Sequence, residues 1–424
     1  MRLKSLTFRN RNRRRIRNRN RRRDGSRMTW TLLLFAPFAL FVPAKADHLA
    51  AQQFSDRIVA EEDSSLGPLA LREVVTGLDH PWAVAVLPNG DFLITERPGR
   101  LLSVATGGDR HISVVEGVPE VFAAGQGGLL DVVLSPTFER DRLVYFSYAR
   151  PVSGGAVTAV SRGRLVRRGR NAALTDQEVL FTLNRVVGGG VHFGSRLAFD
   201  RNGLLYITVG ERGQAEQAQD PSNHQGSVVR LNPDGSVPAG NPVRIETGAS
   251  AQVLARGLAR GLYTWGHRNA QGIAVHPDTG QVWLHEHGPR GGDEINVLRA
   301  GANYGWPLVT YGVAYSGRKI TEHTSRLGFE DPLLHWTPSI APSGMAFVSS
   351  AEFPQWRGDI LVGALAGKHL RRVHLDSAYR PVDQEVLFQG FARFRDVRNV
   401  SDGSVYLLTD AGPDGGLYRL ERRR

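Results

Sequence analysis

Short runs of apolar and β-branched residues recur along the chain, each just after a turn rich in Gly, Asp or Asn. Six such runs end the segments 87–95, 141–148, 200–208, 277–284, 356–362 and 401–409. A second apolar segment precedes each of them, at 82–87, 129–134, 196–199, 272–275, 344–348 and 396–400. Two apolar runs joined by such a turn are typical of a β-hairpin. The pattern therefore predicts six hairpins.

This repetition predicts an all-β fold, namely a six-bladed β-propeller of four-stranded antiparallel blades, in residues 70–424. A pair of β-sandwiches is the alternative, but it does not account for the regular repeat. The longer intervals at 209–265 and 287–344 are expected to be inserted loops, which usually build the functional site of a propeller. Residues 47–69 are expected to form an N-terminal extension.

The first 46 residues differ from the rest in composition. They hold 14 Lys and Arg and one acid, Asp24, and an apolar run at 30–42 precedes Ala44-Lys45-Ala46. This order is typical of a secretory signal peptide, predicted to be cleaved after Ala46. An uncleaved anchor is the alternative, although the run is short for a membrane span and contains Pro37. We expect a periplasmic or secreted protein, exported by the Sec route, with no stable membrane insertion after cleavage.

The formal net charge of +12 comes from this leading segment, whether translation starts at Met1 or at Met28. Without its 14 basic residues and one acid, the totals of 53 and 41 leave 39 basic and 40 acidic residues, about −1. A nearly neutral folded part gives no indication of nucleic-acid binding. The absence of cysteine excludes disulfides, thiolate nucleophiles and Cys-bound metals.

The polar stretches 263–272 and 285–296 are candidates for a site. Arg268 and Asn269 immediately precede a predicted strand, so we expect them at a blade mouth. Gly288-Pro289 predicts a tight turn whose carbonyl oxygens suit a hard cation such as Ca²⁺, but ordinary turn chemistry accounts for the same residues. His285 and His287 alternate on one strand and also suit a Zn²⁺ pair, although no third ligand is evident nearby.

His192 lies in the glycine-rich segment 188–196, at the entrance to a predicted strand. A histidine there is a candidate general base because its ordinary pKa is close to neutrality. A loop histidine with purely structural hydrogen bonds is the alternative.

Lysine is scarce in residues 47–424, which hold Lys319 and Lys368 against 37 arginines. Four cationic side chains would converge if their loops face one axis: Arg268, Lys368, Arg393 and Arg395. Such a cluster predicts a pocket for a small polyanion, because guanidinium groups match carboxylates. A solvated charged face is the alternative.

Together these stretches resemble the soluble PQQ-dependent sugar dehydrogenases, the glucose/sorbosone dehydrogenase family of six-bladed propellers. Within it they look most like the bacterial aldose sugar dehydrogenases. The matching motifs follow the family order at 77–83, 125–130, 192–196, 266–272, 286–289, 293–296, 303–307 and 393–396. Each motif is weak by itself, but eight in order are specific.

The resemblance implies a PQQ- and Ca²⁺-dependent oxidoreductase that converts aldose sugars to lactones at the anomeric carbon. Electrons would pass to an external acceptor that the sequence does not identify. By the same resemblance the general base is His192, and Gln126 and Arg268 line the substrate and quinone oxygens. The remaining implied site residues are Asn269, Lys368, Arg393 and Arg395 for PQQ, Gly288 and Pro289 for Ca²⁺ through their carbonyls, and Glu294 and Tyr304 for a second Ca²⁺.

Val191 departs from the family pattern, because members tuned for glucose carry an acid immediately before the catalytic histidine. We therefore expect no acid to orient the imidazole, and a broader aldose range. Two other classes stay open: a non-catalytic sugar- or protein-binding propeller of the same family, and a Ca²⁺-dependent propeller lactonase. The first would be expected to lose His192 or the cationic set, and the second would need carboxylates around the axis.

Overall fold

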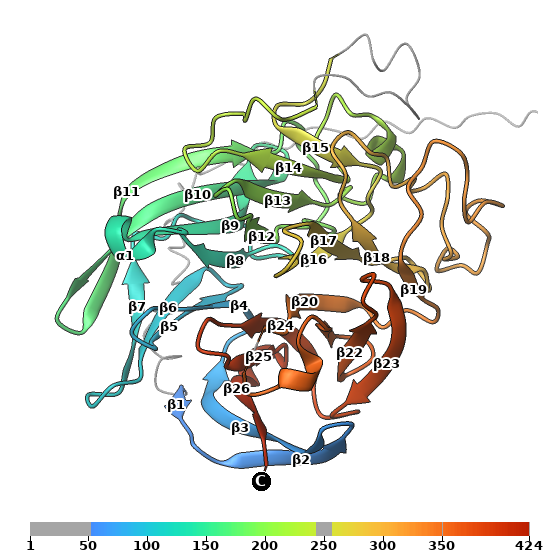
Figure 1. Ribbon diagram of the computed structural model, residues 1–424. Coiled ribbons are helices and arrows are strands. Elements are labelled where there is room, and N and C mark those ends of the chain that lie inside the picture. The colour runs from blue at the N-terminus through green and yellow to red at the C-terminus, as the bar shows by residue number, and fades with distance from the viewer. Residues whose placement is uncertain (1–51, 243–256, 350, 424) are drawn as a thin grey trace, which may run out of the picture. The chain divides into compact units, whose positions relative to one another are not determined.

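The computed structural model describes residues 52–242, 257–349 and 351–423. The predicted signal peptide and its cleavage site lie outside these residues. Within them the chain is built almost entirely of β-strands (Figure 1). None of the helices in the described residues is long and apolar enough to cross a membrane.

Hydrogen bonds join the described strands into five sheets, within which antiparallel groups of four recur. The largest sheet contains β4 (Pro81–Val86), β5 (Phe92–Glu96), β6 (Arg100–Ala105), β7 (His111–Glu116), β8 (Leu129–Leu134), β9 (Leu143–Val152), β10 (Gly155–Arg168) and β11 (Asn171–Thr182). It consists of two antiparallel groups, β4–β7 and β8–β11, which meet through one short parallel pairing of β11 with β7.

Three sheets of four antiparallel strands follow along the chain. The first contains β12 (Leu197–Phe199), β13 (Leu205–Val209), β14 (Ser227–Leu231) and β15 (Leu262–Trp265). The second contains β16 (Ala270–Val275), β17 (Val282–Glu286), β18 (Asp293–Val297) and β19 (Leu334–Trp336). The third contains β20 (Pro342–Phe347), β21 (Ile360–Ala364), β22 (His369–Leu375) and β23 (Pro381–Leu387).

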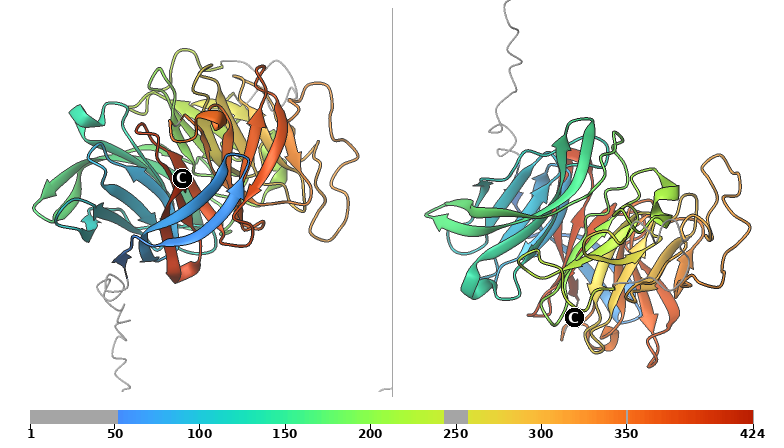
Figure 2. Two further views of the ribbon diagram at one scale, coloured as in Figure 1. Left: turned by 60° about the horizontal axis from the view of Figure 1, so that its bottom comes forward. Right: turned by 90° about the horizontal axis from the view of Figure 1, so that it is seen from above.

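The last sheet combines both ends of the described chain. It contains β24 (Phe394–Asn399), β25 (Val405–Thr409), β26 (Gly415–Arg422) and β3 (Gly67–Leu78), with β1 (Gln53–Phe54) and β2 (Ile58–Ser64) paired to β3. Strand β26 pairs antiparallel with β3, placing Leu420 opposite Leu71, so the N-terminal strand completes the C-terminal sheet (Figure 2, left). The helices are short: α1 (Phe138–Asp141), η2 (Ala215–Gln219), η3 (Pro354–Trp356) and η4 (Gly412–Asp414).

The strands predicted from the hydrophobic pattern are confirmed. The six runs that follow a turn form β5, β9, β13, β17, β21 and β25, and the segments before them form β4, β8, β12, β16, β20 and β24. Each predicted pair is an antiparallel neighbour. Every residue of β5, β13, β17 and β21 is buried, because these strands are covered on both faces; this is why they appear as continuous apolar runs.

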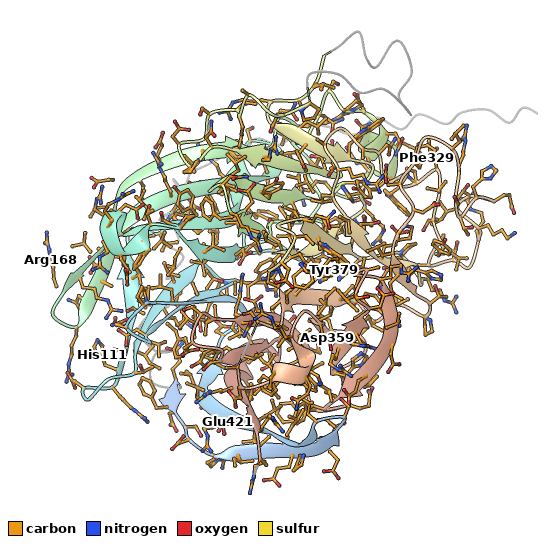
Figure 3. All side chains as sticks on the ribbon, in the orientation of Figure 1. His111, Arg168, Phe329, Asp359, Tyr379 and Glu421 are labelled. Carbon is orange, nitrogen blue, oxygen red and sulfur yellow. The ribbon has the colours of Figure 1, made fainter. Side chains whose placement is uncertain are left out.

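The first strands of the groups contact one another in a closed series: β4 with β8, β8 with β12, β12 with β16, β16 with β20, β20 with β24, and β24 with β4. The sheets are therefore arranged around a common axis in a β-propeller-like fold (Figure 1). Side chains fill the layers between neighbouring sheets (Figure 3). The rings of Phe92 and Tyr406, for example, meet edge to face at 5.0 Å across one such layer.

The predicted insertions are loops that also contain short strands. The interval 209–265 includes η2, β14 and β15, and the interval 287–344 includes β18 and β19. The connection between β18 and β19 projects away from the sheets (Figures 1 and 2).

Buried charges lie between the innermost strands. Arg196 Nη1 lies 2.8 Å from Asp396 Oδ1, and Arg398 Nε lies 2.8 Å from Asp396 Oδ2. Arg398 also binds Asp131, and the Arg196 guanidinium lies 4.0 Å from the ring of Trp82. Burial lowers the pKa of Arg196 despite both carboxylates, so this cluster depends on close pairing.

Candidate active site

A cavity of about 690 Å³ opens at one end of the axis. Residues at or just before the start of each innermost strand line it: Trp82, Leu130, Gly194, Gln271, Ala341 and Arg395. The closed series of strands therefore brings distant parts of the chain to one place, and short polar segments at the strand starts face a shared space.

Several residues predicted from the sequence border this cavity. Gln126, Asn269, Arg393 and Arg395 line it. His192 is adjacent, because its backbone N–H donates to Gln126 Oε1 at 2.7 Å and its neighbours Phe193 and Gly194 line the wall.

Two of the predicted cations lie elsewhere. Arg268 lines a much smaller second cavity, together with Glu286, Glu294 and Tyr304. Lys368 is exposed in the loop after β21 and does not line either cavity, although Leu365 of the same loop lines the large one.

His192 has an acidic partner that the sequence did not indicate. Its Nδ1 lies 2.6 Å from Glu211 Oε2, and the same oxygen accepts the N–H of Gly213 at 2.8 Å. An ionised carboxylate only accepts hydrogen bonds, so Glu211 holds the proton on Nδ1 and leaves Nε2 as an acceptor. The expectation that no acid orients this imidazole is therefore wrong. Val191 is not acidic, but the acid comes from the end of β13.

The backbone of His192 is in the left-handed region, with φ of +49°. This conformation is costly for a residue with a Cβ and persists only where its surroundings impose it. Gln126 holds the N–H of His192, and Asn269 Oδ1 accepts the N–H of Gly194 at 3.1 Å. Two predicted site residues thus also fix the backbone on which His192 stands.

The cavity carries an excess of positive charge. Arg395 Nη2 lies 2.6 Å from Asp410 Oδ2, and Arg393 Nη2 lies 3.5 Å from the same oxygen. Burial alone would raise the pKa of Asp410, but the two arginines lower it overall, so this carboxyl is ionised. A third arginine, Arg97, also lines the cavity and was not selected from the sequence. Three guanidinium groups face one carboxylate, which favours an anionic ligand.

The turn at Gly288 is held rigidly beside this cavity. The Asp293 carboxylate accepts the N–H groups of Gly288 at 2.9 Å and Ile340 at 2.8 Å, and burial raises its pKa. The Gly288 carbonyl accepts from Arg268 Nη1 at 2.9 Å. A carbonyl oxygen has two lone pairs, so this bond leaves one for a hard cation. The backbone oxygens of Gly288 and Pro289 are compatible with Ca²⁺.

Two acidic side chains meet at the smaller cavity. Glu286 pairs with His267 Nδ1 at 2.7 Å and accepts the N–H of Arg268 at 2.5 Å. Burial, followed by the nearby Glu286 charge, raises the pKa of Glu294 well above its ordinary value. A cation between these oxygens would relieve that repulsion. In the described residues no group of three or more His, Asp or Glu side chains is arranged to hold a metal.

The histidines of the Zn²⁺ alternative are engaged by backbone carbonyls. His285 Nε2 faces the carbonyl of Ser343, and His287 Nε2 lies 2.6 Å from that of Pro342. Burial lowers the pKa of His285 to about 3 and that of His287 well below its ordinary value. Both rings therefore act as neutral donors to β20, which does not support a shared Zn²⁺.

Comparisons with known proteins agree on one family. Residues 78–419 match the family described as Glucose / Sorbosone dehydrogenase. Aldose sugar dehydrogenase YliI of Escherichia coli is 44% identical over 351 residues, covering 82% of this chain and 91% of that protein. Quinoprotein glucose dehydrogenase B of Acinetobacter calcoaceticus is 27% identical over 417 residues, covering 80% and 84%.

Solved structures show the same relationship. The soluble aldose sugar dehydrogenase of Escherichia coli in its apo-form superposes with a TM-score of 0.75 at 40% identity, covering 84% of this chain and 100% of that one. The PQQ-bound aldose sugar dehydrogenase of Streptomyces coelicolor gives a TM-score of 0.66 at 26% identity, covering 85% and 99%.

Proposed function

Because the chain belongs to the glucose/sorbosone dehydrogenase family, we propose that it oxidises aldose sugars at the anomeric carbon to lactones, with PQQ and Ca²⁺. The sugar loses a hydride and a proton, and the two electrons pass to an external acceptor. The observation that carries this proposal is the His192–Glu211 pair beside a cavity rich in arginine. The predicted export signal suggests that the reaction takes place in the periplasm or outside the cell.

We propose that the fold behind this site is a six-bladed propeller. The two groups in the eight-stranded sheet count as separate blades, because their parallel contact pairs only Ala172 and Ala173 with Val115 and Glu116. Each blade then contributes its innermost strand to the closed series around the axis.

His192 acts as the general base in this proposal. Its Nε2 accepts the proton of the anomeric hydroxyl, while Glu211 keeps the proton on Nδ1 and stabilises the imidazolium that forms. Gln126 fixes the backbone of His192 and offers its amide to the sugar, and Arg268 supports the quinone side of the reaction.

PQQ, when bound, supplies an ortho-quinone that accepts the hydride. It is a tricarboxylate, so the arginine-rich cavity fits it in charge. Arg393, Arg395 and Asn269 would hold it, with Arg97 as a further cation and Lys368 at the rim. The Gly288 and Pro289 carbonyls would hold the Ca²⁺ ion near them, and Glu294 and Tyr304 would serve a second one.

The observations do not favour the rival functions. A Ca²⁺-dependent lactonase would need several free carboxylates around the axis, whereas Asp410, the acid in the cavity lining, is engaged by two arginines. A non-catalytic propeller would have no use for a histidine oriented by a buried acid.

Reconstitution tests the function directly. Residues 47–424 would be purified, treated with chelator, and mixed with PQQ and Ca²⁺ before aldose-dependent dye reduction is measured with several sugars. We expect activity only with both additions, restored by Ca²⁺ and not by Zn²⁺. His192→Asn serves as a matched control that binds PQQ but turns over roughly 10²–10⁴-fold more slowly. Neither PQQ binding nor activity in the wild-type protein would refute the proposal.

A further inference from the structure

Arg212 is a buried cation next to the acid that orients His192. Its side chain is 1% exposed, and burial lowers its pKa to about 10 against the opposing effect of Glu211. Placing a guanidinium group in such surroundings is costly unless its donors are used well. The proposed reaction gives Arg212 no part, so its position requires another explanation.

The printed hydrogen bonds of Arg212 go to backbone carbonyls, and two of these flank the proposed base. Nη1 donates to Val191, the residue before His192. Nη2 donates to Gly189 at 2.7 Å and to Ala156 at 3.2 Å. The guanidinium carbon also lies 3.4 Å from the ring centre of Phe193, the residue after His192.

The segment held in this way has little rigidity of its own. Residues 188–190 are three consecutive glycines, which lose more conformational freedom on ordering than other residues do. His192 follows them with a positive φ that its own side chain disfavours. Gln126 and Asn269 hold the segment on the cavity side, and Arg212 holds it from the opposite, buried side.

We propose that Arg212 is a positioning residue, which clamps the backbone around His192 so that the imidazole meets Glu211. Two consecutive residues at the end of β13 then hold the base at two points: Glu211 grips the ring and Arg212 grips the backbone on both sides of it. This inference rests on the proposed role of His192 as the general base.

The test compares Arg212→Met and Arg212→Lys with Arg372→Met. Arg372 is a suitable control because it is also a buried arginine, but it pairs with Asp359 at 2.5 Å and Glu385 at 2.9 Å, in the sheet of β20–β23 (Asp359 is labelled in Figure 3). Four quantities are measured: kcat, KM, the thermal unfolding midpoint, and the downfield proton resonance of the His192–Glu211 bond in the PQQ-free protein. That resonance is assigned by its absence in His192→Asn.

For Arg212→Met we expect kcat to fall roughly 10²-fold, because small misplacements of a base have effects of that size. KM and PQQ affinity should change little, and the downfield resonance should shift or disappear. Arg212→Lys should recover part of both signals. Arg372→Met should lower only the unfolding midpoint.

The inference is overturned if folded Arg212→Met or Arg212→Lys keeps both kcat and the downfield resonance while only its unfolding midpoint falls. An inactive wild-type protein would instead refute the proposed function. The resonance in the PQQ-free variants would then still decide whether Arg212 positions His192.

Discussion

His192 Nδ1 and Glu211 Oε2 lie 2.6 Å apart although 19 positions separate the two residues along the chain. The Glu211 side chain is 3% exposed and that of His192 is 15% exposed, so the acid is buried behind the ring and the ring faces the cavity. This arrangement keeps one nitrogen protonated and leaves the other available to a substrate. It suits a base that must be regenerated in every cycle.

Replacing Glu211 with Gln should slow turnover by at least about 10²-fold, because an amide can hold the ring but cannot stabilise the imidazolium. Steady-state kcat with a saturating aldose measures the effect. PQQ affinity should be unchanged, since Glu211 does not line the cavity. A variant with wild-type kcat would show that the acid is only structural.

The combined change Arg393→Met and Arg395→Met should weaken PQQ binding roughly 10–100-fold, because each arginine offers charge-assisted hydrogen bonds. Lys368→Met should have a smaller effect, below about 10-fold, because this lysine is exposed and outside the cavity lining. Titration of PQQ into the apo-protein measures all three. A larger loss in Lys368→Met would indicate that its loop closes over the ligand.

Asp396→Asn should destabilise the fold by about 3–5 kcal/mol, because it leaves Arg196 and Arg398 without half of their negative partners inside the protein. Asp376→Asn is the matched control: it also removes an aspartate that pairs with an arginine, Arg380, at 2.8 Å, but at the surface. Its expected cost is about 0–1 kcal/mol. Urea unfolding curves measure both, and equal midpoints would contradict the prediction.

His224 predicts a pH dependence of stability. Its Nε2 donates to the Arg260 carbonyl at 3.0 Å while its Nδ1 accepts from Asn184 N at 3.3 Å, so the folded protein needs the neutral ring. Burial lowers its pKa to about 4. Between pH 6.5 and 4 the unfolded chain therefore binds a proton that the folded protein does not, and stability falls on acidification by up to about 1.4 kcal/mol per pH unit.

His224→Asn should remove this part of the pH dependence, whatever it does to stability at pH 7. Unfolding free energies measured at pH 7, 6, 5 and 4 for both proteins give the difference. The same slope in the variant and the wild type would show that His224 is protonated without cost in the folded protein.

The sequence pattern was most informative for strands covered on both faces. All five residues of β5 and of β21 are buried, so their apolar runs are continuous and the hairpins can be predicted. The outer strands were not predicted, because β7 and β23 are partly exposed and mix polar with apolar residues. Their place in the sheets depends on pairing with inner neighbours, which no local pattern records.

The same limit applies to the site. Arg393 and Arg395 could be placed together because they alternate on one short segment, and both line the cavity. Glu211 and Arg97 were missed because the partners that give them meaning, His192 and the cavity, belong to other sheets. Their contacts exist only once the innermost strands close around the axis. Glu211 directly follows Gly210 at the end of β13, a local signal that could have been noticed.

The pairing of β3 with β26 has a consequence for how the protein can be made. Residues 67–78 emerge from the ribosome early, but their partner at 415–422 is the last strand to be synthesised. The ring of sheets cannot close until translation is almost complete, and until then β3 presents an unpaired edge. A product truncated before residue 415 would lack the clasp altogether, so we expect quality control to remove it rather than leave a partly active enzyme.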